Sequence, residues 1–250
     1  LNVVEPKAVS GKGGKVTLEP DIKDEFRILA MVPDVDRLIR AGAKVIIASH
    51  NGRFKDIQRN PAGYVLDPVP DKLRELKPDW NLKYIGKTTG PEVQSKVDSL
   101  REGEALLLGN LREDPGEEAG DPYYAEAIYQ AVRPDAIVFG AFAAAHRGKQ
   151  ASLGPYINIH RRVKPGAPVI GAGLIRKELQ GIQEFLSDPE ARKNGVAILG
   201  GAKLDEKIEV MREIIKGHRV KKLIVLGAMS FYFRIAQGRR VGNSFLESRD

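Results

Sequence analysis

Cysteine is absent from the 250 residues, so the chain has neither a disulfide framework nor thiolate chemistry. This absence agrees with a reducing compartment, and we expect an intracellular protein, in the cytoplasm or an organelle. Long apolar runs are also missing. No stretch approaches the roughly 20 residues that a membrane-spanning helix needs, and no secretory signal is visible. The sequence therefore excludes a membrane-spanning helix.

Aromatic residues are scarce, at 6% of the chain, whereas basic residues are plentiful and give a net charge of +7. This charge favours an anionic partner, such as a phosphorylated metabolite, nucleic acid or an acidic protein surface. Nucleic-acid-binding proteins cluster their basic residues and interleave aromatics, but here the basic residues are dispersed. The composition therefore disfavours direct nucleic-acid binding and leaves a small phosphorylated metabolite or an acidic protein surface as the anionic partner. We also expect no metal held by histidine, because no metal-ligand spacing links His50, His146, His160 and His218.

Helical and strand-like patterns alternate along the chain. The stretch "VDRLIRAGAKVIIASH", residues 35–50, gives an amphipathic helix and then a β-branched run, and the same order recurs before "EALLLGN" and "DAIVFGAF". Such alternation predicts an α/β fold in which a parallel sheet has helices on both faces, in a Rossmann-like three-layer arrangement. We expect the runs "VIIAS", "EALLL" and "AIVF" to share one sheet.

Prolines and glycines interrupt this alternation at "RRVKPGAPVIGAG", residues 161–173. Such a stretch is typical of a domain boundary. The sequence thus predicts a first domain over residues 1–170, an interdomain helix over residues 174–188 and the truncated start of a second α/β domain over residues 195–250.

Basic side chains follow several of the predicted strands. His50 and Arg53 come after one strand, Arg112 after the next, and a third strand precedes His146, Arg147 and Lys149. Ligands of open parallel sheets bind at the carboxyl ends of the strands, so these residues are candidates for one anion pocket. The alternative is that each is a solvated loop residue.

The stretch "AILGGAKLDEKI", residues 197–208, passes from a strand pattern through Gly200 and Gly201 into a helix that carries Lys203 and Lys207. Glycines permit close approach of a ligand, and a helix start favours an anion, which together describe a phosphate cradle. A tight turn with two solvated lysines is the alternative. A second glycine-rich stretch, "SGKGGKVT" at residues 10–17, lacks the P-loop spacing, and we expect a flexible loop there.

Seven motifs occur together and in order, and with them the chain resembles the phosphoglycerate kinase family: "RILAMVPDVDRLIRAGAKVIIASHNGR", "TTGPEV", "LLLGNLR", "AFAAAHR", "RKEL", "AILGGAKLDEKI" and "GAMSFYF". The resemblance implies a glycolytic transferase that passes a phosphoryl group between ATP or ADP and 3-phosphoglycerate or 1,3-bisphosphoglycerate. It also implies an N-terminal domain for the phosphoglycerate, a C-terminal domain for Mg-ATP or Mg-ADP, and closure about a hinge.

The resemblance assigns roles residue by residue. Arg27 would stabilise the transferring group, and Lys203 would follow the moving phosphoryl charge. The substrate would contact Asn2, His50, Arg53, Arg112 and Arg147. The nucleotide phosphates would contact Gly200, Gly201, Lys203 and Lys207. Cations carry these roles because phosphoryl transfer requires positioning and charge neutralisation above all.

The chain also departs from the family pattern. The "DFNVP" element is reduced to "LNVVEP" with the loss of an aspartate that orients Arg27, and the loop before Arg27 looks enlarged. The polar "NDAFG" stretch reads "FGAFA", "SHLGRP" reads "SHNGRF", and the chain reaches Asp250 before the family's "GGGDT" segment. Two hypotheses follow: a phosphoglycerate kinase, or a non-catalytic subunit whose open second domain a protein partner covers. For the isolated chain we expect impaired nucleotide binding and no turnover.

Overall fold

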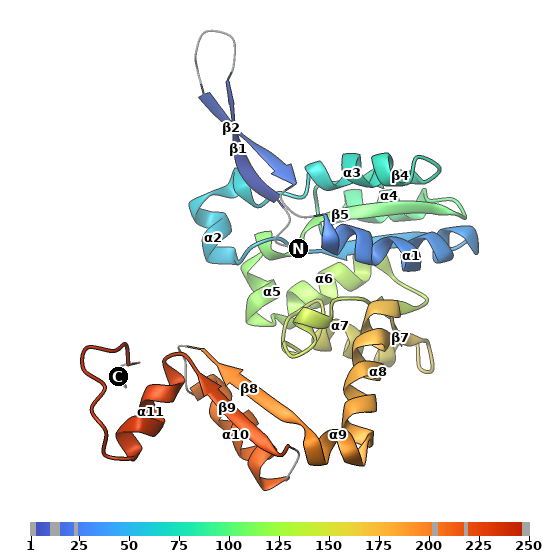
Figure 1. The fold of residues 1–250 in the computed structure, drawn as a ribbon. Coiled ribbons are helices and arrows are strands. Elements are labelled where there is room, and N and C mark those ends of the chain that lie inside the picture. Colours follow the sequence, from blue (N-terminus) through green and yellow to red (C-terminus); the bar gives the residue numbers. More distant parts are fainter. Residues whose placement is uncertain (1–3, 11–15, 23–24, 202–204, 218–219, 247–250) are drawn as a thin grey trace. The chain divides into compact units, whose positions relative to one another are not determined.

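The computed structural model of the chain describes residues 4–10, 16–22, 25–201, 205–217 and 220–246. The chain forms two compact units, Leu1–Arg176 and Lys177–Asp250. Figure 1 labels most helices and strands of both. The first unit contains the larger parallel sheet, of three strands, and the second contains a parallel pair.

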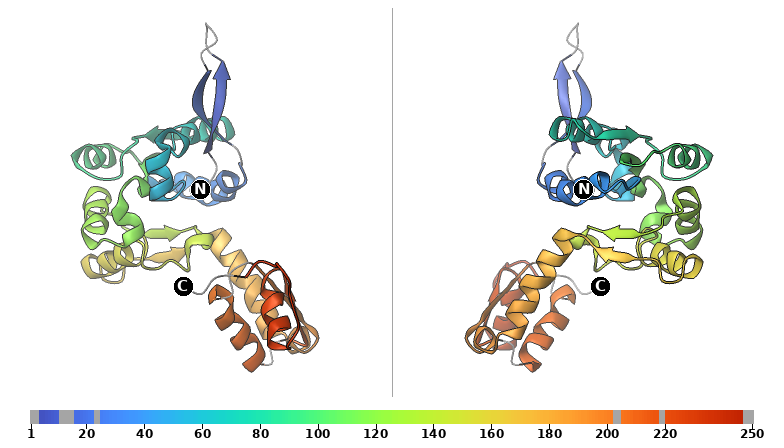
Figure 2. Two further views of the ribbon diagram at one scale, coloured as in Figure 1. Left: turned by 90° about the vertical axis from the view of Figure 1, so that its left-hand side faces the viewer. Right: turned by 90° about the vertical axis from the view of Figure 1, so that its right-hand side faces the viewer.

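The first unit begins with an antiparallel hairpin of β1 (Val4–Ser10) and β2 (Val16–Ile22). Among the described strands these two pair with each other and with no third strand (Figure 2). The expectation of an enlarged loop before Arg27 is therefore wrong, and so is a loop at Ser10, Val16 and Thr17; residues 11–15 lie outside the described residues.

Prolines explain why the sequence hides this hairpin. Pro6 and Pro20 stand opposite each other in the two strands. Proline has no backbone N–H to donate to a ladder, so its presence argues against a strand in any sequence-based interpretation.

The central sheet contains β3 (Val45–Ser49), β4 (Asn81–Tyr84) and β5 (Glu104–Asn110) in the order β3-β5-β4, with both pairings parallel. All residues of the middle strand β5 are buried. Helices and short turns of the first unit connect the strands: α1 (Phe26–Arg40), α2 (Phe54–Arg59), η1 (Pro61–Gly63), α3 (Pro68–Leu76), α4 (Pro91–Asp98), η2 (Leu111–Glu113), α5 (Pro115–Ala119), α6 (Pro122–Val132), η3 (Phe142–Ala144) and α7 (Gly154–Val163).

Side chains of β5 alternate between two apolar clusters, one on each face of the sheet. Ala105 and Leu107 belong to a cluster that includes Ile28 and Val35 of α1 and Leu73 of α3. The neighbouring side chains of β5 belong to a cluster with α4, α6 and α7, through Leu106, Leu108, Val93, Ile128 and Ile159. Because each face of a parallel sheet must be covered, the fully apolar strand forms the middle layer of three. The predicted α/β architecture is confirmed.

The third predicted strand does not join this sheet. β6 (Ile137–Phe139) pairs in parallel with β7 (Val169–Gly171), and these two form a separate sheet. The expectation that "VIIAS", "EALLL" and "AIVF" share one sheet is therefore wrong. Unlike β5, the three-residue strand β6 has an exposed residue, Val138, between two partly buried ones, so it lacks the two buried faces of a central strand.

The second unit contains most of α8 (Gly173–Ser187), followed by α9 (Pro189–Asn194), β8 (Val196–Gly200), α10 (Asp205–Lys216), β9 (Lys222–Leu226) and α11 (Met229–Ala236). β8 and β9 pair in parallel. Successive strand residues point to opposite faces, and one face leaves Val196, Ile198, Ile224 and Leu226 exposed. The second unit thus presents an apolar sheet face.

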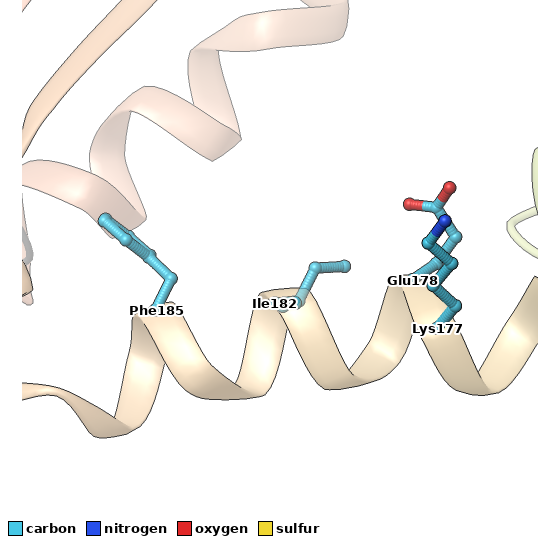
Figure 3. A pocket seen from close by; sticks show the side chains of 5 residues that line it. Lys177, Glu178, Ile182 and Phe185 are labelled. Carbon is cyan, nitrogen blue, oxygen red and sulfur yellow. The ribbon is translucent and has the colours of Figure 1, made fainter.

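An open groove runs along α8 of the same unit. Lys177, Glu178, Gly181, Ile182 and Phe185 line it, and Figure 3 shows the four labelled side chains standing on one side of the helix. Its apolar members are partly exposed, with Ile182 at 47% and Phe185 at 42% of full exposure. The groove is therefore another apolar surface rather than a cationic one.

Candidate anion-binding site

Two strands of the central sheet end side by side. Ser49, the last residue of β3, is paired with Asn110, the last residue of β5. The segments that follow, His50–Arg53 and η2, consequently start from the same edge of the sheet. Parallel pairing places the carboxyl ends of both strands at one edge of the sheet, so these two basic segments lie close together.

The Asn110 side chain joins the two segments. Its Oδ1 atom accepts from the backbone N–H of Asn51 at 3.0 Å and of Arg112 at 3.1 Å. Its Nδ2 atom donates to the carbonyl oxygens of Asn51 and Tyr64, each at 2.8 Å. One buried amide thus satisfies four backbone groups that would otherwise lie unpaired.

Arg112 is held next to this amide. Its side chain is buried, and Nη1 donates to the carbonyl oxygen of Gly52 at 2.5 Å. Its Nε atom is buried without a hydrogen-bond partner among the described residues. Burial lowers the pKa of Arg112, and the nearby charges of Arg147 and Arg53 act in the same direction. The guanidinium therefore retains an unused donor in a region of excess positive charge.

His50 lies close to the same arginines and is half-buried. The pKa of this half-buried imidazole is lowered to about 3, first by burial and then by surrounding cations that include Arg112, Arg147 and Arg27. His50 is consequently neutral at neutral pH. The charges of Arg27, Arg112 and Arg147 lower the pKa of His50, and the charge of Arg53 lowers the pKa of Arg112. These four arginines therefore act on the same edge of the sheet.

These residues come from different elements. Arg27 is exposed in the first turn of α1, and Arg53 is exposed at the residue before α2. Arg147 is half-buried in the segment after η3, whereas His146 and Lys149 of the same segment are exposed. Asn2, the remaining candidate for substrate contact, lies outside the described residues. We name Arg27, Arg53, Arg112 and Arg147, together with the neutral His50 among them, the cation cluster.

Acidic residues beneath the cation cluster escaped the sequence analysis. Glu117 and Glu118 lie in α5, directly after Arg112 and η2. Glu118 Oε1 lies 3.9 Å from Arg112 Nε, and Glu117 accepts two hydrogen bonds from Ser152. Their sequence signal is weak, because adjacent glutamates early in a helix are ordinarily explained by the helix dipole.

The glycine-rich turn of the second unit is partly described. Gly201 follows β8 with a φ of +148°, and nothing lies within 4 Å of the position that a Cβ would occupy there. Its carbonyl oxygen accepts from the backbone N–H of Met229 at 3.3 Å, so the turn after β8 lies beside the turn after β9. Lys207 is half-buried in the first turn of α10, and Lys203 lies outside the described residues.

The space beside the two glycines of this turn differs. A Cβ on Gly200 would stand 3.3 Å from the Cβ of Leu226, a tight contact, while nothing lies within 4 Å of a Cβ on Gly201. Open backbone followed by a helix start is the arrangement that permits an anion to approach. For the parts of the chain that the structure describes, no group of three His, Cys, Asp or Glu residues is arranged to hold a metal ion.

None of the helices described here is both long and apolar enough to cross a membrane.

Comparison with known proteins gives one consistent result. The family model for phosphoglycerate kinase matches residues 15–250. Among curated relatives, phosphoglycerate kinase of Chlorobaculum tepidum is 39% identical over 235 residues, which cover 93% of this chain and 55% of the relative. The enzyme of Herpetosiphon aurantiacus is 35% identical over 227 residues, or 91% of this chain and 53% of the relative. The chain thus spans about half the length of these relatives.

Solved structures that match this chain are also phosphoglycerate kinases. Phosphoglycerate kinase from Pyrococcus horikoshii matches with a TM-score of 0.70 and 27% identity, over 89% of this chain and 52% of that one. The structure from Coxiella burnetii matches with a TM-score of 0.66 and 26% identity, over 99% of this chain and 58% of that one.

Proposed function

Because the chain belongs to the phosphoglycerate kinase family, we propose that its first unit binds 3-phosphoglycerate on the cation cluster. The observation that carries this proposal is the buried guanidinium of Arg112 at the shared edge of β3 and β5, whose Nε atom has no hydrogen-bond partner among the described residues. The lowered pKa values of His50 and Arg112, which are caused first by burial and then in part by neighbouring arginines, support it. A bound phosphate or carboxylate would offset the positive charge of the arginines, and Nε of Arg112, which has no hydrogen-bond partner among the described residues, would gain an acceptor.

For the reaction we propose that of the family, phosphoryl transfer between ATP or ADP and 3-phosphoglycerate or 1,3-bisphosphoglycerate. In this proposal Arg27 stabilises the transferring group, and His50, Arg53, Arg112, Arg147 and Asn2 hold the substrate. Gly200, Gly201, Lys203 and Lys207 would hold the phosphates of Mg-ATP or Mg-ADP, which supplies or accepts the phosphoryl group. The open backbone at Gly201 supports the nucleotide part.

Calorimetry with 3-phosphoglycerate tests the substrate proposal. We expect a heat of binding that falls as salt is added, and Arg53→Ala and Arg112→Ala should each weaken binding roughly tenfold or more, since each removes a charge-assisted contact. Arg59→Ala is the matched control, because Arg59 is an exposed arginine in the last turn of α2. Unchanged affinity in both site variants would contradict the proposal.

The second candidate function is a non-catalytic, intracellular subunit that meets a protein partner through its second unit. The exposed apolar face formed by Val196, Ile198, Ile224 and Leu226 favours it, because contiguous apolar surface of this kind marks interaction sites. A coupled assay of ADP release tests the non-catalytic candidate. The non-catalytic candidate predicts background turnover for this polypeptide, and turnover that disappears in Lys203→Ala would refute it.

A further inference from the structure

Helix α5 places two neighbouring carboxylates below the cation cluster. Asp114 caps the helix by accepting from the backbone N–H of Gly116 at 2.7 Å, and Gly120 ends it in a left-handed conformation. The helix is only five residues long, and Glu117 and Glu118 are its third and fourth residues. Short and capped at both ends, α5 presents these two side chains to different loops.

Glu118 faces the loop after β3. Its Oε2 atom accepts from the backbone N–H of Phe54 at 2.8 Å, and Phe54 directly follows Arg53. Its Oε1 atom lies 3.9 Å from Nε of Arg112, which is too far for a hydrogen bond. Glu118 therefore ties down the backbone next to one arginine without occupying the donors of another.

Glu117 faces the loop that carries Arg147. This fully buried carboxylate accepts from Ser152 twice, from the backbone N–H at 2.9 Å and from Oγ at 2.5 Å. The backbone carbonyl oxygen of Glu117 also accepts from the N–H of Ala151 at 3.0 Å. The loop lies so close to the end of α5 that a Cβ on Gly120 would stand 2.1 Å from the carbonyl oxygen of Lys149.

Burying a carboxylate is unfavourable, and burial raises the pKa of Glu117 while the hydrogen bonds from Ser152 and the charge of Arg112 oppose that rise. A well-packed apolar side chain would cover the same space without the desolvation cost, so stability alone gives a weak reason for an acid here. The direction of the two side chains supplies a better one: each accepts from the backbone of a loop that bears an arginine of the cluster.

We propose that Glu117 and Glu118 are positioning residues for anion binding, which fix the loops of Arg147 and Arg53 relative to Arg112 through hydrogen bonds to Ser152 and Phe54. For the identity of the anion this inference rests on the proposed function, but the loop geometry does not depend on it.

Two substitutions at each position separate the effect of side-chain length from the effect of charge. Gln keeps the length of the side chain and an acceptor oxygen but removes the charge, whereas Asp keeps the charge and withdraws the carboxylate by one methylene. If position matters, Glu117→Gln and Glu118→Gln bind 3-phosphoglycerate within about threefold of the parent chain, and Glu117→Asp and Glu118→Asp bind roughly tenfold more weakly. Glu126→Asp, at a half-buried carboxylate of α6, is the matched control.

Amide exchange of the ligand-free full chain supplies the second readout. The Asp variants should speed exchange of the Ser152 amide (Glu117→Asp) or the Phe54 amide (Glu118→Asp) roughly tenfold, and the Gln variants should leave both near the parent rates. Asp variants that bind and exchange like the parent chain would overturn the inference, and so would Gln variants that are as impaired as the Asp ones. If the parent chain does not bind 3-phosphoglycerate, the proposed function fails, and exchange alone then decides whether the acids fix the loops.

Discussion

Acidification should destabilise the first unit through His50. In the folded chain the pKa of His50 is lowered to about 3, compared with an ordinary value of 6.5. Below pH 6.5 the unfolded chain therefore takes up a proton that the folded chain does not accept until about pH 3. The unfolded state binds more protons in this window, so the free energy of unfolding must fall as the pH falls.

The size of the effect follows from the two pKa values. At about pH 4.5 the unfolded imidazole is fully charged and the folded one is still neutral, a gap of about two pH units from 6.5, or about 2.7 kcal/mol at 1.36 kcal/mol per unit. Because His50 is half-buried and water reaches part of the ring, we expect about 2 kcal/mol.

Denaturant unfolding at pH 7 and at about pH 4.5 measures this loss. The single tryptophan, Trp80, is buried in the first unit, so its fluorescence reports on that unit rather than on the second. His50→Asn removes the titrating imidazole, while the other titratable groups of the chain contribute equally to both proteins. The parent chain should lose about 2 kcal/mol more than the variant on acidification. An equal loss in both proteins would refute the electrostatic account of the site.

Two further predictions concern the frame of the site, each measured by denaturant unfolding followed at Trp80. Asn110→Ala should destabilise the first unit by about 3 kcal/mol, because it leaves four buried backbone groups unpaired. The control Asn158→Ala, at an exposed residue, should change stability little. A loss below about 1 kcal/mol for Asn110→Ala would count against the Asn110 network. Gly120→Ala should reduce the free energy of unfolding more than Gly90→Ala does. Both glycines have positive φ, but of the two only Gly120 would bring its new Cβ against a backbone oxygen, that of Lys149 at 2.1 Å. Equal losses in the two variants would show that the loop of Lys149 moves to make room.

The layers of the fold could be predicted because their signals are local. β5 is apolar throughout, and its amphipathic helical neighbours follow the usual periods, so the strand's position between two helical layers follows from its composition. The β1–β2 hairpin could not be predicted, because opposed prolines argue against strands there. The β6–β7 pair could not be predicted either, because a three-residue strand does not specify its partner.

The candidate site shows the same division. His50, Arg53 and Arg112 could be singled out because each stands just after a strand, which is a feature of a few neighbouring residues. Glu117 and Glu118 could not, because their partners lie 35 and 64 residues away at Ser152 and Phe54. Long-range contacts of this kind depend on how loops close, which no local pattern encodes.

Glu117 and Glu118 also explain how closely spaced arginines can keep hydrogen-bond donors available for a ligand. A carboxylate paired directly with each guanidinium would lower the repulsion among the arginines, but it would occupy the donors that an anion needs. Glu117 and Glu118 accept instead from backbone N–H groups at Ser152 and Phe54, while Nε of Arg112 has no hydrogen-bond partner among the described residues. Their negative charge still reaches Arg112 through space and favours its charged form. The folded chain is thus stabilised against its own positive charge by groups that do not compete with an incoming anion.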